Sequence, residues 1–491
     1  MNRSITRVAV VALLLLAAVV VATTYWQTWA VGGLNDRQDN AIQRVAQLTV
    51  ERGRIIAGDG RTVMATNVAK EVGDQTLYSR TYPTGRLLSN VIGYSTQARS
   101  RTGLERSQND YLTAANAGLG TLADRLSGSM VKGNDLHLTV RPGAQYLAEQ
   151  ALAGRCGSAV ALDPRTGRVL VMATSPGFNP NQVEKDFSKI AATKAPCTPP
   201  APLLNRATAG LFTPGSTFKL ITMAAALDSG AYGPDSSFQD PGYCIEYGKK
   251  VSNYSDQNGP EVFGKVTLTD ALVHSINSVF CELGKELGPK TILSYAKRFG
   301  FYSVPPLETP AGERAASGLY NGSTLYQPKS NSDVDPGRFA FGQERLLVTP
   351  LQMAMVVGAI GNGGIVMRPH VIDHITSPEG KLLTATRREE LGPAIKPETG
   401  AKLTEMMEQA VSRGTGGNAR IPGVRVAGKT GTGETAVPGV NTTWFVAFAP
   451  ADNPTVAVAV VLEGQQGTGG ATAAPIAKTI MQALLRRMPN S

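Results

Sequence analysis

The sequence contains only four histidines and only four cysteines, and none of the cysteines forms a CxxC pair. Zinc sites and histidine-based catalytic triads need such residues, so the sequence gives little support for either. It has no low-complexity segment, no internal repeat and no basic block, although its formal net charge is +10. Nucleic-acid binding requires a clustered basic footprint. We therefore expect no metal, no cofactor and no nucleic acid, and a general attraction to anionic surfaces such as membrane or wall polymer.

Long apolar runs are also scarce, and the one that is present lies at the N-terminus. Two arginines precede an uncharged stretch over residues 8–30 that ends in aromatic side chains. This order is typical of a positive-inside anchor, with residues 1–7 in the cytoplasm. A cleaved signal peptide is the alternative, but bulky Tyr25 and Trp26 follow the apolar core where cleavage needs small residues. We expect an uncleaved single-pass anchor in the plasma membrane, with everything after residue 30 outside the cytoplasm.

The length of 491 residues suggests two or three domains. Residues 31–145 form a turn-rich block that ends in a short strand and a helix, and we expect a separate N-terminal domain there. Residues 146–491 open with a hairpin pattern over 157–175 and close with strand patterns and a helix. The expected later elements are helices near 216–229, 267–287 and 349–361, strands within 424–433, 442–451 and 455–464, and a closing helix over 474–488. The late strands must pair with the early hairpin, which predicts one sheet with helices packed on it.

The stretch TPGSTFKL places a serine and a lysine at the start of an apolar helix. Thr213 is a candidate N-cap, Pro214 fits the first helical position, and Gly230 is a good terminator. Ser216 and Lys219 are spaced i, i+3, so they share one face of the helix. A buried lysine is driven towards its neutral form, which makes it a base beside a nucleophile. By itself the S-x-x-K pattern is common, and a helix-start serine with a solvated lysine would explain it equally well.

Two further stretches carry polar residues that could act with this pair. In LVHSINSVF, Ser275 and Asn277 are two residues apart, so in a turn or extended segment they can face the same side. In VAGKTGTG, an apolar strand is followed by Lys429, Thr430, Gly431 and Thr432. A lysine with a hydroxyl can bind a carboxylate, and a glycine leaves room for a substrate backbone to lie along the strand. Each stretch alone is also explained by helix capping or by protection of a sheet edge.

Together and in this order, S-x-x-K, S-x-N and K-T-G resemble the penicillin-binding proteins and related serine β-lactamases. Longer stretches resemble class B penicillin-binding proteins: RGRIIAGDGRTVMA, TGLERSQNDYL, ALDPRTGRVLVMATSPGFNPN and FGQERLLVTPLQMAMVVGAIGNGG. The resemblance implies an α+β transpeptidase domain with a central antiparallel sheet flanked by helices, behind a pedestal of the dimerisation type. The chain departs from the family at Gly433 and Glu344, where alanine and glycine are usual, and lacks the usual TID before residue 141. These departures concern acceptor preference and groove shape.

The resemblance also implies catalytic roles. Ser216 would attack the penultimate D-alanine of a peptidoglycan stem peptide, and Lys219 would take its proton. Ser275 would pass a proton to the leaving D-alanine, while Asn277 would hold the side-chain amide of the substrate or of a β-lactam. Lys429 and Thr430 would orient the terminal carboxylate, and the backbone N–H groups of Ser216 and Thr432 would form the oxyanion hole.

The partners implied by the resemblance are stem peptides, β-lactam antibiotics and a membrane glycosyltransferase of the shape-and-division family. A D,D-carboxypeptidase or other β-lactam-interacting hydrolase would share the three motifs. An inert scaffold for wall assembly is a non-enzymatic alternative, against which the complete motif set argues. The four cysteines allow three pairings. Cys197 and Cys244 lie in Pro/Gly-rich loops, and we expect them to pair if only one disulfide forms.

Overall fold

A computed structural model describes residues 2–28, 47–73, 75–97, 99–115, 132–256, 259–435, 437 and 439–486. The first element is α1 (Asn2–Thr28), which contains a stretch from Arg3 to Trp26 with a mean hydropathy of 2.7 and no buried residues. Its length and composition suffice to cross a membrane. The predicted end of the anchor, at residues 29 and 30, lies outside the described residues.

A five-stranded antiparallel sheet organises the second half of the chain. Its strands are β5 (Cys156–Leu162), β6 (Val169–Ser175), β20 (Ala427–Glu434), β21 (Asn441–Ala449) and β22 (Val456–Gln465), in the order β20-β21-β22-β5-β6. The late strands therefore pair with the early hairpin, as predicted, because β22 pairs with β5. Strand β20, which carries the K-T-G motif, lies at one edge of the sheet.

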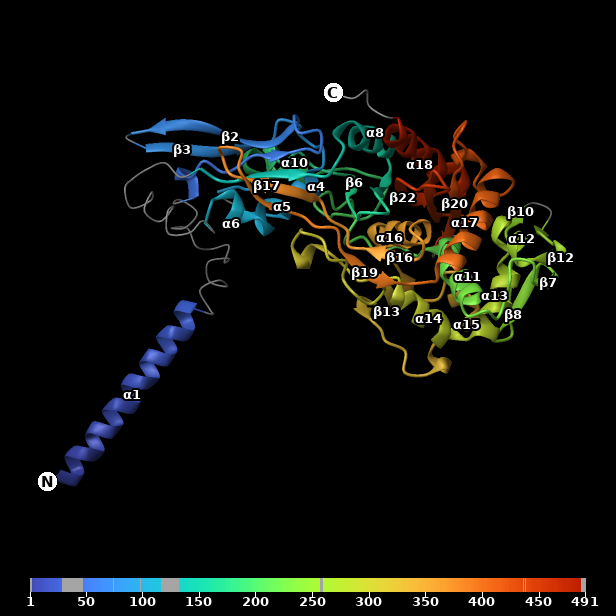
Figure 1. Cartoon of the computed structure of the whole chain (residues 1–491), viewed down its shortest axis with the longest axis horizontal. Helices are drawn as coiled ribbons and strands as arrows, with labels where there is room; N and C mark the ends of the chain where they lie inside the picture. Colours follow the sequence, from blue (N-terminus) through green and yellow to red (C-terminus); the bar gives the residue numbers. More distant parts are fainter. Residues whose placement is uncertain are drawn as a thin grey trace.

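Both faces of this sheet are covered by helices, which explains why its strands are apolar on both sides. Ala159 faces one cluster of buried residues, formed with α8 (Pro142–Leu152) and α18 (Gly469–Leu485). The next residue, Val160, faces the opposite cluster, formed with α11 (Lys219–Asp228) and α16 (Pro350–Gly361). Figure 1 shows α8 and α18 side by side on one side of β22, with α16 on the other. The alternation follows the two-residue period of a strand.

A second, six-stranded sheet lies in the N-terminal part of the chain, in the order β18-β17-β4-β1-β2-β3. Its strands are β1 (Ile55–Ile56), β2 (Val63–Val72), β3 (Gln75–Thr81), β4 (Asp135–Leu138), β17 (Ile372–Thr376) and β18 (Leu382–Ala385). The last two come from far along the sequence, and β17 pairs antiparallel with β4. In Figure 1 the orange β17 accordingly lies among the blue strands of this sheet. Sequence analysis did not anticipate this return of the chain.

The remaining helices range from single turns to the 16 residues of α17, and two of them, α13 and α15, contribute to the cleft described below. They are α4 (Ser89–Ile92), α5 (Gly103–Ser107), α6 (Asn109–Leu112), α9 (Asn181–Lys185), α10 (Phe187–Ala191), α12 (Leu268–Val273), α13 (Asn277–Leu287), α14 (Pro289–Arg298), α15 (Pro336–Ala340) and α17 (Pro397–Ser412). The short strands are β7 (Ser237–Asp240), β8 (Tyr243–Glu246), β9 (Lys249–Ser252), β10 (Ser255–Asp256), β11 (Gly259–Pro260), β12 (Gly264–Thr267), β13 (Gly318–Asn321), β14 (Thr324–Leu325), β15 (Leu346–Leu347), β16 (Ile365–Met367) and β19 (Glu390–Pro393). The expected run over 267–287 is thus two helices separated by a turn.

The start of the helix after Ser216 differs from the prediction. The chain forms a 3-10 turn, η2 (Gly215–Thr217), and the α-helix begins only at Lys219. The cause is Gly215, whose φ of +51° is incompatible with a right-handed helix. Thr213 is therefore not an N-cap. The C-terminal end agrees better with the prediction, since Gly230 has a φ of +76°, the left-handed conformation of a helix terminator.

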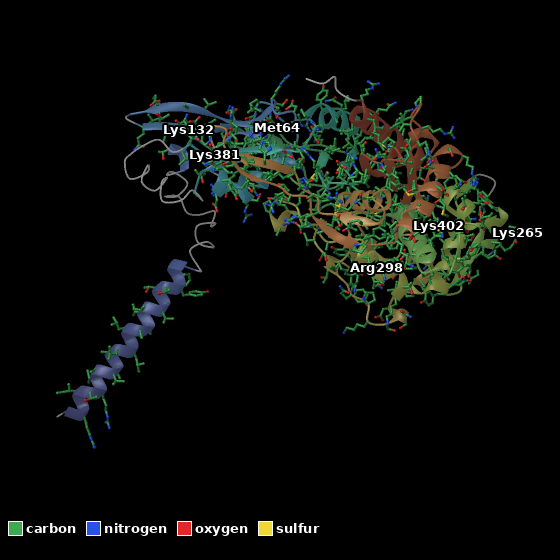
Figure 2. The ribbon with its side chains drawn as sticks, in the orientation of Figure 1. Met64, Lys132, Lys265, Arg298, Lys381 and Lys402 are labelled. Atoms are coloured by element: carbon green, nitrogen blue, oxygen red, sulfur yellow. A yellow bond between two sulfur atoms is a disulfide. The ribbon has the colours of Figure 1, made fainter. Side chains whose placement is uncertain are left out.

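Basic side chains are spread over the molecule. In Figure 2, Lys132 and Lys381 lie at the end that holds the six-stranded sheet, whereas Lys265 and Lys402 lie at the opposite end. All four are exposed.

The N-terminal sheet is held to α5 by an ion-pair network that is buried. Glu105 accepts hydrogen bonds from Arg52 (Nη2 to Oε2, 2.8 Å) and from Arg80 (Nε to Oε1, 2.6 Å), and its side chain is fully buried. Burial raises the pKa of Glu105, but Arg80 and Arg52 more than offset this, and the net direction is downward. Arg52 and Glu105 belong to the two N-terminal stretches that resemble the family, RGRIIAGDG and TGLE, and the network shows why those residues occur together.

We predict that Glu105→Gln destabilises the six-stranded sheet by about 3 to 5 kcal/mol, because it leaves two buried guanidinium groups without their carboxylate. Hydrogen exchange of the amides of β2 and β4 in the full chain should be correspondingly faster. Glu71→Gln is the matched control, since Glu71 lies on the exposed part of β2. Equal exchange rates in the two variants would contradict a stabilising role for the network.

Candidate active site

Ser216 lies in the middle of the 3-10 turn η2 and is half-buried. The turn is fixed from one side by the N–H of Gly215, which donates to the carbonyl of Gly342 (3.0 Å). From the other side, the indole N–H of Trp444 on β21 donates to the carbonyl of Thr213 (2.9 Å). The serine is therefore presented on a rigid support between the sheet and the loop after α15.

Lys219 begins α11, and its side chain is fully buried. Its ammonium donates to the carbonyl of Ser275 (2.7 Å), to Ser275 Oγ (3.3 Å) and to Asn277 Oδ1 (2.8 Å). Within the described residues no hydrogen bond joins Lys219 to Ser216. The lysine of S-x-x-K thus connects directly to both polar residues of S-x-N, which the two-residue spacing predicted to face one side.

Lys429 on β20 approaches the same serine hydroxyl from the opposite side. Its Nζ donates to Ser275 Oγ (2.8 Å) and to the carbonyl of Thr430 (3.1 Å), and the side chain is fully buried. Ser275 lies in the turn between α12 and α13 with a φ of +60°. This unusual backbone conformation points its hydroxyl to a position between two amines.

Burial is the main electrostatic influence on both lysines. It holds the pKa of Lys219 well below its usual value, and the nearby charge of Lys429 acts in the same direction. Burial alone lowers the pKa of Lys429 to about 7. The direction at Lys219 is the one that an acid–base role at neutral pH requires. A neutral Lys219 still has two N–H groups with which to donate to the acceptors around it.

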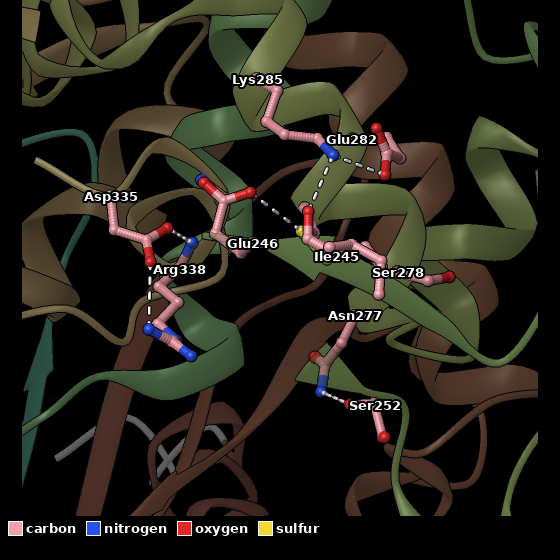
Figure 3. Close-up of a disulfide and its surroundings, with 12 residues drawn as sticks. Ile245, Glu246, Ser252, Asn277, Ser278, Glu282, Lys285, Asp335 and Arg338 are labelled. Atoms are coloured by element: carbon pink, nitrogen blue, oxygen red, sulfur yellow. Dashed lines mark hydrogen bonds and ion pairs between the residues drawn. A yellow bond between two sulfur atoms is a disulfide. The ribbon is translucent and has the colours of Figure 1, made fainter. Parts of the chain in front are cut away.

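Asn277 is the first residue of α13, and a network beneath that helix fixes it. Its Nδ2 donates to the carbonyl of Ser252 at the end of β9 (3.1 Å), as Figure 3 shows. The neighbouring Ser278 N–H donates to Asn253 Oδ1 (2.9 Å), and Asn253 in turn donates to both oxygens of Asp240 (3.0 Å each). The amide of Asn277 is thus tied to the β8–β9 hairpin.

The disulfides differ from the predicted pairing. Cys156 pairs with Cys197, and Cys244 pairs with Cys281, so the predicted Cys197–Cys244 bond is wrong. Loop position was a poor guide, because Cys244 lies in strand β8 and not in a loop, and each of the two cysteines pairs with one in a regular element: Cys156 begins β5, and Cys281 lies in α13. The second disulfide joins β8 to α13 beside Asn277 (Figure 3).

Strand β20 packs tightly against the turn η2, which carries Ser216. A side chain on Gly431 would lie 2.7 Å from Thr217 Cγ2 and 2.8 Å from the carbonyl oxygen of Pro214. The space beside Gly431, expected to admit substrate, is therefore occupied by the turn that carries Ser216. Thr430 Oγ1 lies 2.7 Å from Thr415 Oγ1, which comes from the loop after α17.

A single cleft of about 810 Å³ brings these elements together. It is lined by the predicted residues Ser216, Ser275, Asn277, Thr430 and Thr432. Lys219 and Lys429 lie buried behind it. Lining residues that sequence analysis missed include Thr415, Ser252, Arg338 and Thr468. No sequence spacing links them to the three motifs, since they reach the cleft only through tertiary folding.

A half-buried serine that shares a cleft with a second serine held by two buried amines, at the edge of a five-stranded antiparallel sheet, is the arrangement of an active-serine acyltransferase. Comparison with known families agrees. Residues 157–482 match the penicillin binding protein transpeptidase domain, and residues 52–136 match the penicillin binding protein A dimerisation domain. The chain therefore belongs to the penicillin-binding-protein transpeptidases, as its motifs suggested.

Full-length relatives and solved structures have the same organisation. The chain is 33% identical to the peptidoglycan D,D-transpeptidase PbpA of Mycolicibacterium smegmatis, over 99% of each chain, and 32% identical to that of Mycobacterium tuberculosis over the whole of both. It superposes on penicillin-binding protein A from M. tuberculosis in its ceftriaxone acyl-enzyme complex with a TM-score of 0.79, at 31% identity over 90% of this chain and all of that one. The D,D-transpeptidase domain of a peptidoglycan glycosyltransferase from Eggerthella lenta gives a TM-score of 0.74 at 33% identity, over 89% of this chain and 99% of that one.

We predict that removing the Cys244–Cys281 disulfide, by replacing both cysteines with serine, slows covalent labelling by a fluorescent penicillin several-fold. The reason is that α13 then loses its covalent link to β8 beside Asn277. The Cys156–Cys197 pair is a matched control, because its sequence separation of 41 is close to the 37 of the other. Both losses should lower stability by a similar amount, about 2 to 4 kcal/mol. Equal labelling rates in the two folded variants would contradict a role for this disulfide in positioning the site.

Proposed function

We propose that Ser216 is the nucleophile of a serine-type D,D-transpeptidase that cross-links peptidoglycan stem peptides and is acylated by β-lactams. The chain is a D,D-transpeptidase by family, and the residue assignments are our proposal. The observation that carries them is the position of two buried amines, those of Lys219 and Lys429, on the hydroxyl of Ser275, which lines the same cleft as Ser216. A serine hydroxyl needs such a base to be nucleophilic at neutral pH.

In the acylation step, Lys219 takes the proton of Ser216 as Oγ attacks the carbonyl carbon of the penultimate D-alanine. The C–N bond to the terminal D-alanine breaks, and its nitrogen receives a proton through Ser275. The hydrogen bonds between Ser275 and both lysines support this relay. The backbone N–H groups of Ser216 and Thr432 would stabilise the oxyanion.

Substrate recognition is assigned to the cleft walls. Lys429 and Thr430 would receive the terminal carboxylate of the donor, Thr432 would line its backbone along β20, and Asn277 would hold its side-chain amide. Gly431 would act only through its lack of a side chain, which lets the turn that carries Ser216 lie against β20. The position of β20 at the sheet edge supports this assignment, because an extended peptide can lie alongside an edge strand.

A cross-link forms when an amine of a second stem peptide attacks the acyl-enzyme; attack by water would make the protein a carboxypeptidase. The two activities can be distinguished by incubating the purified protein with a stem-peptide donor and an acceptor. A transpeptidase forms cross-linked product, whereas a carboxypeptidase releases free D-alanine without a cross-link.

We further propose that α1 anchors the protein in the plasma membrane, with Met1 in the cytoplasm and the cleft on the outer side. The uncharged part of α1 after Arg7 and the two arginines that precede it, Arg3 and Arg7, support this orientation. Residues 31–145 would then form the pedestal and 146–491 the transpeptidase domain.

Leu382 and Leu383 are exposed on the edge strand β18 and offer a surface for a membrane glycosyltransferase.

We predict that Ser216→Ala abolishes labelling by a fluorescent penicillin and that Lys219→Arg is nearly as damaging. Arginine keeps the positive charge but cannot release its proton at neutral pH, so it cannot act as the base. Lys429→Ala should be milder, because it mainly weakens binding of the carboxylate. Thermal melting checks that each variant is folded. Labelling of folded Lys219→Arg at the wild-type rate would show that Lys219 is not the base.

The pH dependence of labelling should separate the two lysines. The rate is expected to rise with pH while Lys219 loses its proton, and to fall above about 7, where Lys429 loses its charge. Lys429→Arg keeps a positive charge at every accessible pH, so the descending limb should disappear while the ascending limb stays. A descending limb unchanged in the folded Lys429→Arg protein would assign it to another group.

A further inference from the structure

Glu344 lies in a loop that is fixed directly against the nucleophile turn. The loop follows α15, and its Gly342 accepts the hydrogen bond from the Gly215 N–H (3.0 Å). A side chain on Gly342 would come within 2.0 Å of the Gly215 carbonyl oxygen, which shows how closely the two segments pack. Glu344, two residues further on, lines the same cleft as Ser216. Glu344 therefore belongs to the wall of the cleft that Ser216 lines, on a loop fixed against the turn of that serine.

The conformation of Glu344 is held in place by the surrounding structure. Its φ is +44°, a region where residues other than glycine are uncommon, and its side chain is only 18% exposed. One carboxylate oxygen, Oε1, accepts a hydrogen bond from Arg345 Nε (3.0 Å). In the described part of the chain the other oxygen, Oε2, has no protein donor. A carboxylate held this way keeps acceptor capacity for a ligand.

Among the described residues, Glu344 is ion-paired with Arg345 through Oε1 only, and it is the least exposed of the acidic residues along the cleft. Glu261 and Glu434 also line it, but both are exposed to solvent. Of the lining cations, Arg338 is engaged by Asp335 (3.2 Å), and Lys250 lies over the ring of Tyr243. Glu344 is thus the partly buried anion of this cleft wall, in the place where a cation could approach Ser216.

We propose that Glu344 recognises the acceptor: its carboxylate binds the amine of the second stem peptide as an ammonium ion beside the acyl-enzyme. The proposal rests on the proposed transpeptidase function and adds a specificity-determining residue to it. The motifs shared with the family account for attack on the donor, and none of them binds a cation. An amine acceptor is a cation at neutral pH, so a fixed carboxylate beside the acyl group favours it over water.

The chemistry balances as follows. The bound ammonium gives one proton to Glu344 or through it to solvent, which leaves the nitrogen lone pair free. That nitrogen attacks the ester carbonyl carbon, the new C–N bond forms, and the ester C–O bond to Ser216 breaks. A second proton passes from the nitrogen through the lysine–serine relay to Ser216 Oγ, which restores the hydroxyl. No oxidant, metal or further reactant is needed.

The test uses the full chain in detergent and measures the ratio of the product formed by attack of the amine to the product formed by attack of water on the acyl-enzyme. An N-acyl-D-alanyl thioester serves as donor and Nα-acetyl-D-lysine amide as acceptor, and products are expressed per acyl-enzyme formed. Glu344→Gln should lower the amine-to-water product ratio about tenfold at subsaturating acceptor, because the charge-assisted contact is lost. Glu344→Gly should do the same, and glycine suits the φ of +44°, so this variant is expected to fold. With methanol, an uncharged nucleophile, the ratio should stay unchanged.

Glu434→Gln is the matched control, an exposed carboxylate on the same cleft. Its amine-to-water ratio should change less than twofold, since exposed charges are screened. The proposal is wrong if both Glu344 variants divide the acyl-enzyme as the wild type does. It is also wrong if Glu434→Gln loses as much as Glu344→Gln, because the cleft would then act only through its overall charge. Failure of the underlying function would appear separately, as absence of any acyl group on Ser216 in the wild-type protein, and would remove this proposal as well.

Discussion

Two lysine amines, those of Lys219 and Lys429, are buried against the hydroxyl of Ser275, and much of the structure serves to keep them there. Burying an amine is costly unless its N–H groups are satisfied or it gives up its charge. Here both occur, since acceptors surround Lys219 and burial lowers the pKa of both groups. The same desolvation that would destabilise the fold therefore supplies the proton acceptor that a serine nucleophile needs. The cost is offset by the apolar packing of α11, whose ten residues are all buried.

Three separate elements must meet for this arrangement to exist, and each is held by different means. The turn η2, which carries Ser216, is held by backbone hydrogen bonds and by Trp444. The turn with Ser275 is followed by α13, which a disulfide and the Asp240 network tie to the β8–β9 hairpin. Lys429 is held by β20, which pairs along its whole length with β21. Because β20 is an edge strand, its outer side is open to the cleft, while its inner side keeps all its hydrogen bonds to β21.

The sequence patterns predicted the pairing of the late strands with the early hairpin, and the resemblance to penicillin-binding proteins implied the fold class and five of the residues that line the cleft. Predictions failed where the outcome depends on contacts distant in sequence. The helix start after Ser216 is displaced by the positive φ of Gly215, which the loop at Gly342 stabilises. Disulfide pairing depends on which strand or helix lies opposite a loop, and Thr415 reaches Thr430 only after folding. Propensity and spacing carry no information about such approaches.

The segment of the chain between α16 and α17 links the six-stranded N-terminal sheet to the domain that contains the five-stranded sheet. After α16 the chain leaves the catalytic sheet, contributes β17 and β18 to the six-stranded sheet, and returns through β19 to α17. On the way it is tied to the β5–β6 hairpin, since His370 accepts from the Val169 N–H (2.9 Å) and Asp373 pairs with Arg168 (2.8 Å). The N-terminal sheet is thus completed by a segment whose two ends lie in the catalytic unit. The same segment continues into α17, which leads directly into the loop where Thr415 contacts Thr430 at the cleft.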